Sequence, residues 1–201
     1  MFKLLYAPAS PYARKVRVVL DELGQADEVE LVHVATSPTA PAAEVAAAHA
    51  LKKIPALIRP DGCTLYDSRV ITRYLDARAG TQFYPESHLW ETLTLEATGD
   101  GIMDAAVLMV YEGRCRPEDK QDKGWLDAQW GKIDNALDAL QERWMSHLAG
   151  PLDAGAISVG CALAYLDFRH GERSWRMGRD LLDDWFAVFA ERPSMQATRP
   201  V

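Results

Sequence analysis

The sequence from residue 2 to residue 24 reads FKLLYAPASPYARKVRVVLDELG, and this stretch decides how the fold begins. Residues 2–6 favour a β-strand, and Ser10, Pro11 and Gly24 suit the N-cap, the first turn and the end of a following helix. Between them, apolar residues recur at helical spacing. The predicted buried face holds Ala13, Val16, Val19, Leu20 and Leu23, and the predicted solvent face holds Arg14, Lys15, Arg17, Asp21 and Glu22. The pattern therefore predicts a strand followed by an amphipathic helix.

Strands and helices continue to alternate up to residue 79. The predicted elements are a strand at 28–34, a helix at 41–50, strands at 55–59 and 63–66 joined by the turn Pro60-Asp61-Gly62, and a helix opened by Asp67 and Ser68. The order β-α-β-α-β-β-α is that of a thioredoxin-like domain. We therefore predict an α/β thioredoxin-like N-terminal domain over residues 1–79, with the strand pairing inferred by analogy with that fold.

After a predicted linker at residues 80–87, strand patterns disappear. The predicted helices cover 88–113, 117–145, 157–168 and 180–191, and the last of them ends before Pro193. The segment 157–168 is apolar on nearly all sides, which is typical of a helix buried at a domain centre. Residues 88–201 are therefore predicted to form an all-α C-terminal domain.

Charge and cysteine content exclude several classes of protein. The chain has 201 residues and a formal net charge of −7, and its 22 Lys and Arg residues form no basic run. Nucleic-acid and membrane partners are therefore not expected. The three cysteines include no Cys-x-x-Cys pair, and the five histidines lack metal-ligand spacing. We expect no metal and a cytoplasmic protein, because no apolar run reaches the length of a signal core or a membrane span.

Ser10 is the first candidate for chemistry. The N-terminus of a helix carries unpaired N–H groups and positive partial charge, which stabilise an anion such as a thiolate. Lowering a thiol pKa by about two units takes about 2.7 kcal/mol. One hydroxyl hydrogen bond to a charged group supplies about 1.5 to 3 kcal/mol. The alternative is that Ser10 only caps the helix, and Tyr6 is a fallback hydroxyl that the strand pattern places in the core.

Two dipeptides could hold a peptide ligand beside that helix. A cis bond at Ile54-Pro55 would leave the N–H and C=O of Ile54 free to pair with an extended peptide, whereas a trans bond would make Pro55 an ordinary edge residue. Asp67 and Ser68 could receive the ammonium and carboxylate of an amino-acid-like group at a second helix start. The alternative for Asp67 is a simple N-cap.

Order and spacing together carry more information than each motif alone. The sequence resembles the glutathione S-transferase family over nearly its whole length. The resemblance rests on SPYARKVR at 10–17, KIPAL at 53–57 and YDS at 66–68, and the stretches DGIMDA at 100–105 and LAYLDFR at 163–169 look like a bacterial subgroup.

The resemblance implies a transferase of the detoxification type that uses glutathione as co-substrate, acts on an electrophilic small molecule and forms a homodimer. It implies that Ile54 presents its backbone to the cysteinyl unit, that Asp67 and Ser68 hold the γ-glutamyl end, and that Lys53 lies near the glycyl carboxylate. Its glutathione-binding positions also include Tyr12 and Pro55.

Serine at position 10 bears on the reaction. Ser10 can stabilise a thiolate but cannot form the mixed disulfide of thiol-disulfide exchange, so we expect conjugation rather than disulfide reduction. A non-catalytic glutathione-binding or protein-interaction module, or a glutathione-dependent oxidoreductase, are the alternatives. We expect the second substrate between the domains, beside Met103, Val107 and Tyr111, although these residues could instead pack against the next helix.

Two stretches depart from the family pattern. HALK at 49–52 stands where the family commonly has Asn-Pro-x-Gly, which leaves the contacts of Lys52 and Lys53 open. Ser158 and Cys161 stand where the family often has a Ser/Thr-x-x-Asp capping box. Because Cys161 cannot return the reciprocal bond, lower stability is expected in that half.

Overall fold

The computed structural model describes residues 1–80 and 83–200, which form two compact units. The first unit is Met1–Glu86 with the tail from Pro193, and the second unit is Ser87–Arg192. The sequence pattern assigns that tail to the helical half, but it groups with the first unit. Two residues of the predicted linker, Thr81 and Gln82, lie outside the described residues.

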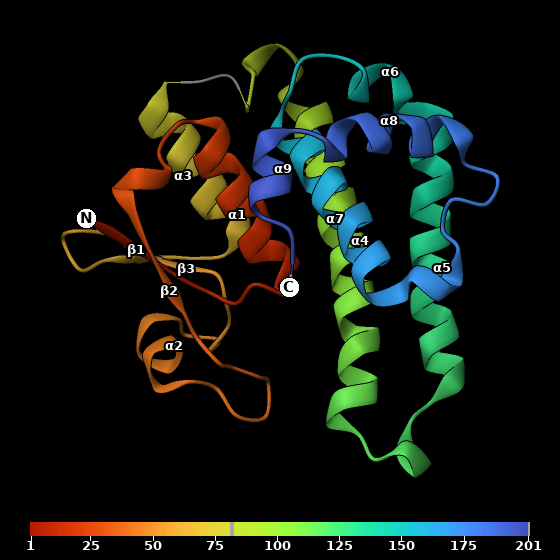
Figure 1. Cartoon of the computed structure of the whole chain (residues 1–201), viewed down its shortest axis with the longest axis horizontal. Coiled ribbons are helices and arrows are strands. Elements are labelled where there is room, and N and C mark those ends of the chain that lie inside the picture. The colour runs from red at the N-terminus through yellow and green to blue at the C-terminus, as the bar shows by residue number, and fades with distance from the viewer. Residues whose placement is uncertain (81–82, 201) are drawn as a thin grey trace. The chain divides into compact units, whose positions relative to one another are not determined.

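The first unit is built on a four-stranded sheet with the order β2-β1-β3-β4. Its elements are β1 (Phe2–Tyr6), α1 (Pro11–Glu22), β2 (Val29–His33), α2 (Ala43–Ala48), β3 (Ala56–Ile58), β4 (Thr64–Leu65), α3 (Ser68–Ala79) and α9 (Pro193–Ala197). Leu4 of β1 pairs with Leu31 of parallel β2 and with Leu57 of antiparallel β3. In Figure 1, α1 and α3 lie side by side and α2 lies across the strands from them. This arrangement confirms the predicted thioredoxin-like fold.

Helix α1 begins and ends where the sequence indicates, but the solvent face predicted for it is partly wrong. Arg14 and Lys15 are only 5% and 1% exposed. Helix α9, which the sequence pattern missed, packs on α1, and Arg14 donates to the Met195 carbonyl at 2.9 Å. The helical period cannot reveal this burial, because the covering segment comes from the far end of the chain. The helix predicted at 180–191 does end before Pro193, but it is not the last helix, because Pro193 begins α9.

The second unit is all-helical in its described residues, as predicted. Its helices are α4 (Leu89–Cys115), α5 (Lys123–Ala139), α6 (Met145–Leu148), α7 (Ala154–His170) and α8 (Asp180–Ala190), with a π-helical turn at Leu140–Trp144 between α5 and α6. The predicted helix at 117–145 is therefore interrupted. Helices α4 and α7 lie side by side and form the centre of this unit (Figure 1).

The N-terminus of α7 lies one turn earlier than predicted. Asp153 is its N-cap and accepts the Ala156 N–H at 2.8 Å, whereas Ser158 lies inside the helix. The predicted position of the cap at Ser158 is therefore wrong, and the lower stability expected from Cys161 loses that argument. The Ser158 hydroxyl donates instead to Asp100 of α4 at 2.9 Å. The sequence could not distinguish the two positions because the segment is apolar on nearly every side.

Within the described part of the chain, we find no helix that is both long and apolar enough to cross a membrane.

Candidate functional site

Ser10 lies between β1 and α1 and caps the helix. Its Oγ accepts the Ala13 N–H at 3.2 Å, and its carbonyl accepts the Arg14 N–H at 3.0 Å. Pro11 has no N–H, and the N–H groups of Ala13 and Arg14 are already bonded to Ser10. These three positions therefore offer no open donor to a ligand. Because a hydroxyl has one proton and two lone pairs, the Ser10 O–H can still donate while the oxygen caps the helix. The capping and the chemical interpretations are therefore compatible.

Tyr6 and Tyr12 lie on either side of Ser10 in the chain. Both side chains are partly exposed, so Tyr6 does not lie in the core as its strand position suggested. The Tyr6 ring lies 5.9 Å from the His33 ring, and the Arg17 guanidinium stands 5.2 Å from its centroid. The Tyr6 ring therefore contacts both a tilted histidine ring and a cationic side chain.

The loop before β3 has the geometry that a peptide ligand would need. The Ile54–Pro55 bond is cis, and Pro55 is buried where β3 begins. Among residues 1–80 and 83–200, no hydrogen-bond partner is found for the Ile54 N–H or C=O. Backbone N–H and C=O groups that the fold leaves unpaired can pair with an extended peptide. Lys53 is exposed beside them.

His49 is a residue of this loop that sequence reasoning did not select. It is 3% exposed, and its Nδ1 accepts the Leu51 N–H at 3.0 Å. Its ring stacks on Tyr66, with the ring centroids 3.8 Å apart. Burial is the main cause that lowers the pKa of His49, with a further contribution from Lys53. The unusual HALK stretch was the only signal that pointed to this position.

Asp67 and Ser68 open α3 as predicted. The Asp67 carboxylate caps the helix through the Arg69 N–H at 3.1 Å and also pairs with the Arg69 guanidinium at 2.9 Å. Burial raises the pKa of Asp67, but the bonds and charge of Arg69, with a contribution from Lys15, outweigh it and hold the pKa below its usual value. Ser68 is 3% exposed, and the described chain contains no partner for its hydroxyl. An ionised carboxylate and an unused hydroxyl thus stand together.

The stacked pair of His49 and Tyr66 joins the loop before β3 to the loop before α3. His49 leads to Ile54–Pro55, and Tyr66 directly precedes Asp67. Lys53 and Lys15 add positive charge around these loops, and Asp67 adds a negative one. A small peptide with two carboxylates and one ammonium group, such as glutathione, complements this set of charges.

The predicted second-substrate residues lie on α4 of the second unit. Met103 is fully buried there, whereas Val107 and Tyr111 are partly exposed. Burial raises the pKa of the Tyr111 phenol. Met103 therefore takes the packing role that was its alternative, and Val107 and Tyr111 keep part of their surface open. Whether these residues meet a substrate stays a prediction.

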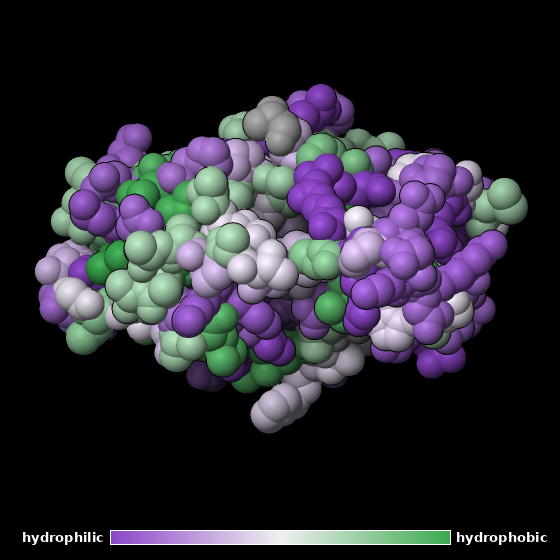
Figure 2. All heavy atoms as spheres, turned by 90° about the horizontal axis from the view of Figure 1, so that it is seen from below, coloured by the Kyte–Doolittle hydropathy of each residue, from purple (hydrophilic) through white to green (hydrophobic). Residues whose placement is uncertain are grey.

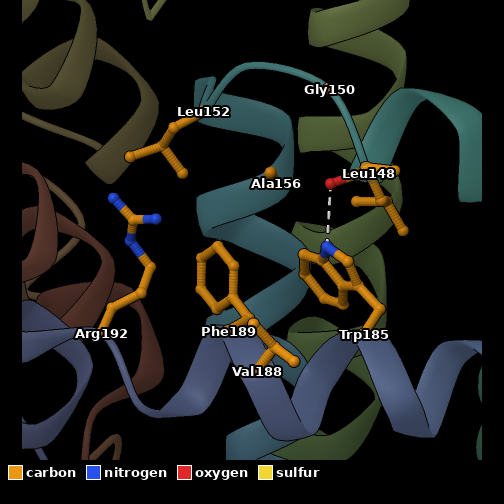
Figure 3. A pocket seen from close by; sticks show the side chains of 9 residues that line it. Leu148, Gly150, Leu152, Ala156, Trp185, Val188, Phe189 and Arg192 are labelled. Carbon is orange, nitrogen blue, oxygen red and sulfur yellow. Dashed lines mark hydrogen bonds between the residues drawn. The ribbon is translucent and has the colours of Figure 1, made fainter.

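A separate hollow in the second unit is lined by none of the predicted site residues. It lies between α8, the start of α7 and the loop after α6, and Figure 3 shows Phe189, Trp185 and Leu152 around it. The Trp185 indole donates to the Leu148 carbonyl at 2.8 Å. On the face drawn in Figure 2, small apolar patches lie among hydrophilic residues on the left, and hydrophilic residues predominate on the right. The described residues contain no group of three or more His, Cys, Asp or Glu side chains that could hold a metal ion.

A thioredoxin-like unit with a cis-proline loop, joined to an all-helical unit, defines the architecture of the glutathione S-transferases. The pattern of the glutathione S-transferase N-terminal domain matches residues 4–83, and that of the C-terminal domain matches residues 123–187. An Escherichia coli K12 protein described as the uncharacterized GST-like protein YibF is 30% identical, over 98% of each chain. The chain belongs to the glutathione S-transferase family.

Solved structures of glutathione transferases also match this chain over its whole length. A glutathione transferase family member from Pseudomonas fluorescens Pf-5, crystallised with bound glutathione, is 46% identical over the whole of both chains, with a TM-score of 0.98. The same protein has been solved with bound S-(propanoic acid)-glutathione. A glutathione S-transferase from Methylobacillus flagellatus KT with glutathione bound is 36% identical over the whole of both chains, with a TM-score of 0.88.

Proposed function

We propose that the protein is a glutathione transferase that stabilises the glutathione thiolate with Ser10 and transfers the sulfur to an electrophilic small molecule. The observation that carries the proposal is the geometry of Ser10, whose oxygen caps α1 through a lone pair and leaves its proton available. Two similar proteins hold glutathione in their crystal structures, which supports glutathione as the ligand here.

Each end of the tripeptide has a matching group in the first unit. The Ile54 backbone, oriented by Pro55, pairs with the cysteinyl unit as a short β-bridge. Asp67 accepts the γ-glutamyl ammonium, and the Ser68 hydroxyl donates to the neighbouring carboxylate. Lys53 lies near the glycyl carboxylate, and Tyr12 lies beside the tripeptide at the start of α1.

The chemical step requires a thiolate at neutral pH. The thiol proton leaves to solvent, and the Ser10 O–H donates to the sulfur anion. The hydrogen bond supplies about 1.5 to 3 kcal/mol and the helix N-terminus about 0.3 to 1 kcal/mol more, which is enough to lower the thiol pKa by about two units. The sulfur lone pair then forms the S–C bond. In a displacement, the leaving group departs with its electron pair. In an addition to an α,β-unsaturated electrophile, sulfur bonds to the β-carbon, the π electrons move to the α-carbon, and the α-carbon takes a proton from water.

The second substrate is an electrophile with a small carbon skeleton. The thioether held by the Pseudomonas fluorescens protein carries a propanoic acid group on the glutathione sulfur, which is the bond that such a transfer forms. We place Val107 and Tyr111 at the wall that contacts this substrate, with Met103 packed behind them. We further propose that the protein is a homodimer in the cytoplasm, with a role in detoxification. Light scattering tests the oligomeric state, and cell fractionation tests the location.

Glutathione binding and turnover test the function together. Calorimetry should detect binding of glutathione, and ultraviolet difference spectra should detect its thiolate at neutral pH. A panel of halogenated and α,β-unsaturated electrophiles should then give conjugates. Binding without turnover would favour a non-catalytic binding module, and reduction of a glutathione mixed disulfide would favour an oxidoreductase. If glutathione does not bind at any concentration, the transferase, the glutathione-binding module and the glutathione-dependent oxidoreductase are all rejected.

A further inference from the structure

We propose that His49 is a pH-dependent positioning residue of the glutathione site, whose neutral ring holds the two tripeptide-binding loops together and whose protonation weakens glutathione binding. The inference rests on the proposed function, because it concerns the same site. It adds a control of affinity by pH that the proposed reaction itself does not require.

The first loop is fixed by two hydrogen bonds of His49. Its Nδ1 accepts the Leu51 N–H at 3.0 Å, and its carbonyl accepts the Lys52 N–H at 2.8 Å. Lys52 has a φ of 54°, a left-handed conformation that side-chain-bearing residues adopt at a cost. These bonds hold the turn that carries the chain into Ile54 and Pro55.

The second loop is fixed by the face of the same ring. The His49 and Tyr66 rings stack with centroids 3.8 Å apart and an interplanar angle of 22°. Tyr66 directly precedes Asp67 and Ser68. The 3% exposure of His49 places its ring in the interior, where movement of either loop requires movement of the ring. One side chain thus sets the spacing of the two loops.

Protonation removes the acceptor on which the first loop depends. Only an unprotonated Nδ1 can accept a hydrogen bond, so a charged ring would face the Leu51 N–H with a second donor. Lys53 repels that charge and Asp67 attracts it, while burial disfavours it. Burial and Lys53 outweigh Asp67, so the pKa of His49 lies below its ordinary value and the ring is neutral at physiological pH.

The expected consequence is a loss of affinity in mildly acidic solution. A binding-competent state that is only partly populated weakens the apparent affinity by that fraction. As the pH falls through the lowered pKa of His49, glutathione binding should weaken about tenfold, which corresponds to the loss of about one hydrogen bond. Asp67 does not obscure this change, because its own pKa is held below its usual value and it stays ionised in the same range.

His49→Asn is the matched variant for the hydrogen bond to Leu51, and it removes the ring that stacks on Tyr66. The Asn Oδ1 is bonded to Cγ, as the His Nδ1 is, so it can accept the same Leu51 N–H without titrating. S-methylglutathione is the probe, because it lacks a thiol that would titrate in the measured range. Its affinity should be measured by calorimetry from pH 5 to pH 8. We expect a tenfold acid loss in the wild type and a flat curve in His49→Asn.

A second measurement follows the protein without any ligand. The Leu51 amide resonance should shift as His49 titrates in the wild type and should stay constant in His49→Asn. Parallel affinity curves for the two proteins, or a Leu51 amide that does not respond to pH, would overturn the role of His49 while leaving the proposed function intact. A wild type that binds no S-methylglutathione and no glutathione would instead reject the proposed function, and with it the control by pH.

Discussion

The hydroxyl oxygen of Ser10 accepts the N–H of Ala13 at 3.2 Å, so that one side chain both caps the start of α1 and keeps a proton for a ligand. A hydroxyl whose oxygen accepts a hydrogen bond is polarised toward donation. The stability of α1 and the chemistry of the site therefore share one residue, and substitutions of Ser10 can separate them.

Ser10→Ala removes both roles. The free energy of unfolding should fall by about 1 kcal/mol, because the N-cap is lost. The kcat/KM for conjugation should fall about 10- to 150-fold, which corresponds to a hydrogen bond of about 1.5 to 3 kcal/mol to a charged group. Ser10→Asp is the control, since it keeps a capping oxygen but brings no proton. It should retain stability and lose activity, and an active Ser10→Ala would show that Ser10 serves only as a cap.

Ser10→Cys should change the type of reaction. A thiol at the helix N-terminus can attack a glutathione mixed disulfide, form a new mixed disulfide and be released by a second glutathione. The variant should gain disulfide reductase activity that the wild type lacks. Mass spectrometry should detect the glutathione adduct on residue 10, and its absence would argue that this position does not face the sulfur.

Asp153 anchors the central helix of the second unit. It is 1% exposed, accepts the Ala156 N–H, and also binds Thr92 at 2.7 Å and His147 at 2.7 Å. Asp153→Ala should lower the free energy of unfolding by about 3 kcal/mol, because a cap is lost and buried polar groups lose their acceptor.

Asp122→Ala is the matched control for that substitution. Asp122 caps α5 through the Trp125 N–H but is exposed. Its removal should cost about 1 kcal/mol. Urea denaturation followed by circular dichroism gives both values, and equal losses would contradict the buried network.

Gly99 permits the close approach of α4 to α7. A Cβ on Gly99 would lie 2.6 Å from the Ser158 Oγ and 2.7 Å from the Ser158 carbonyl carbon. Gly99→Ala should therefore destabilise the protein by about 1 to 3 kcal/mol. Gly101→Ala lies in the same helix, and apart from its chain neighbours and the nearby backbone of that helix no atom of the described residues comes within 4 Å of its Cβ, so it should stabilise the protein by up to about 1 kcal/mol. In thermal unfolding, the melting temperature should fall for Gly99→Ala and rise for Gly101→Ala. A shift in the same direction for both variants would exclude this packing.

His170 makes the stability of the second unit depend on pH. Its Nε2 lies 3.0 Å from the Ala106 carbonyl, and burial lowers the pKa of the ring below 6.5. The unfolded chain therefore takes up a proton first, so the free energy of unfolding should fall as the pH drops from 6.5 to the folded-state pKa. His170→Gln keeps a donor for Ala106 and should show a shallower decline than the wild type from pH 7 to pH 5. Identical declines in the two proteins would refute the prediction.

The sequence by itself determined the features that depend on neighbouring residues. The order β-α-β-α-β-β-α, the caps at Ser10 and Asp67 and the left-handed Gly24 after α1 all follow from local period and local hydrogen bonds. The cis bond at Ile54–Pro55 was one of two conformations that the sequence allowed. The resemblance to the glutathione S-transferase family rested on these same motifs, and the comparisons showed the family.

Only the tertiary structure decided the features whose partners are distant in the chain. Arg14 is buried because α9 arrives from residue 193, and the Asp153 carboxylate is buried where Thr92 and His147 converge on it. The place of His49 in the candidate site depends on the stacking of its ring on Tyr66. Helical period and local capping patterns report on a few neighbouring residues, whereas burial and stacking depend on which surfaces meet once the chain has folded.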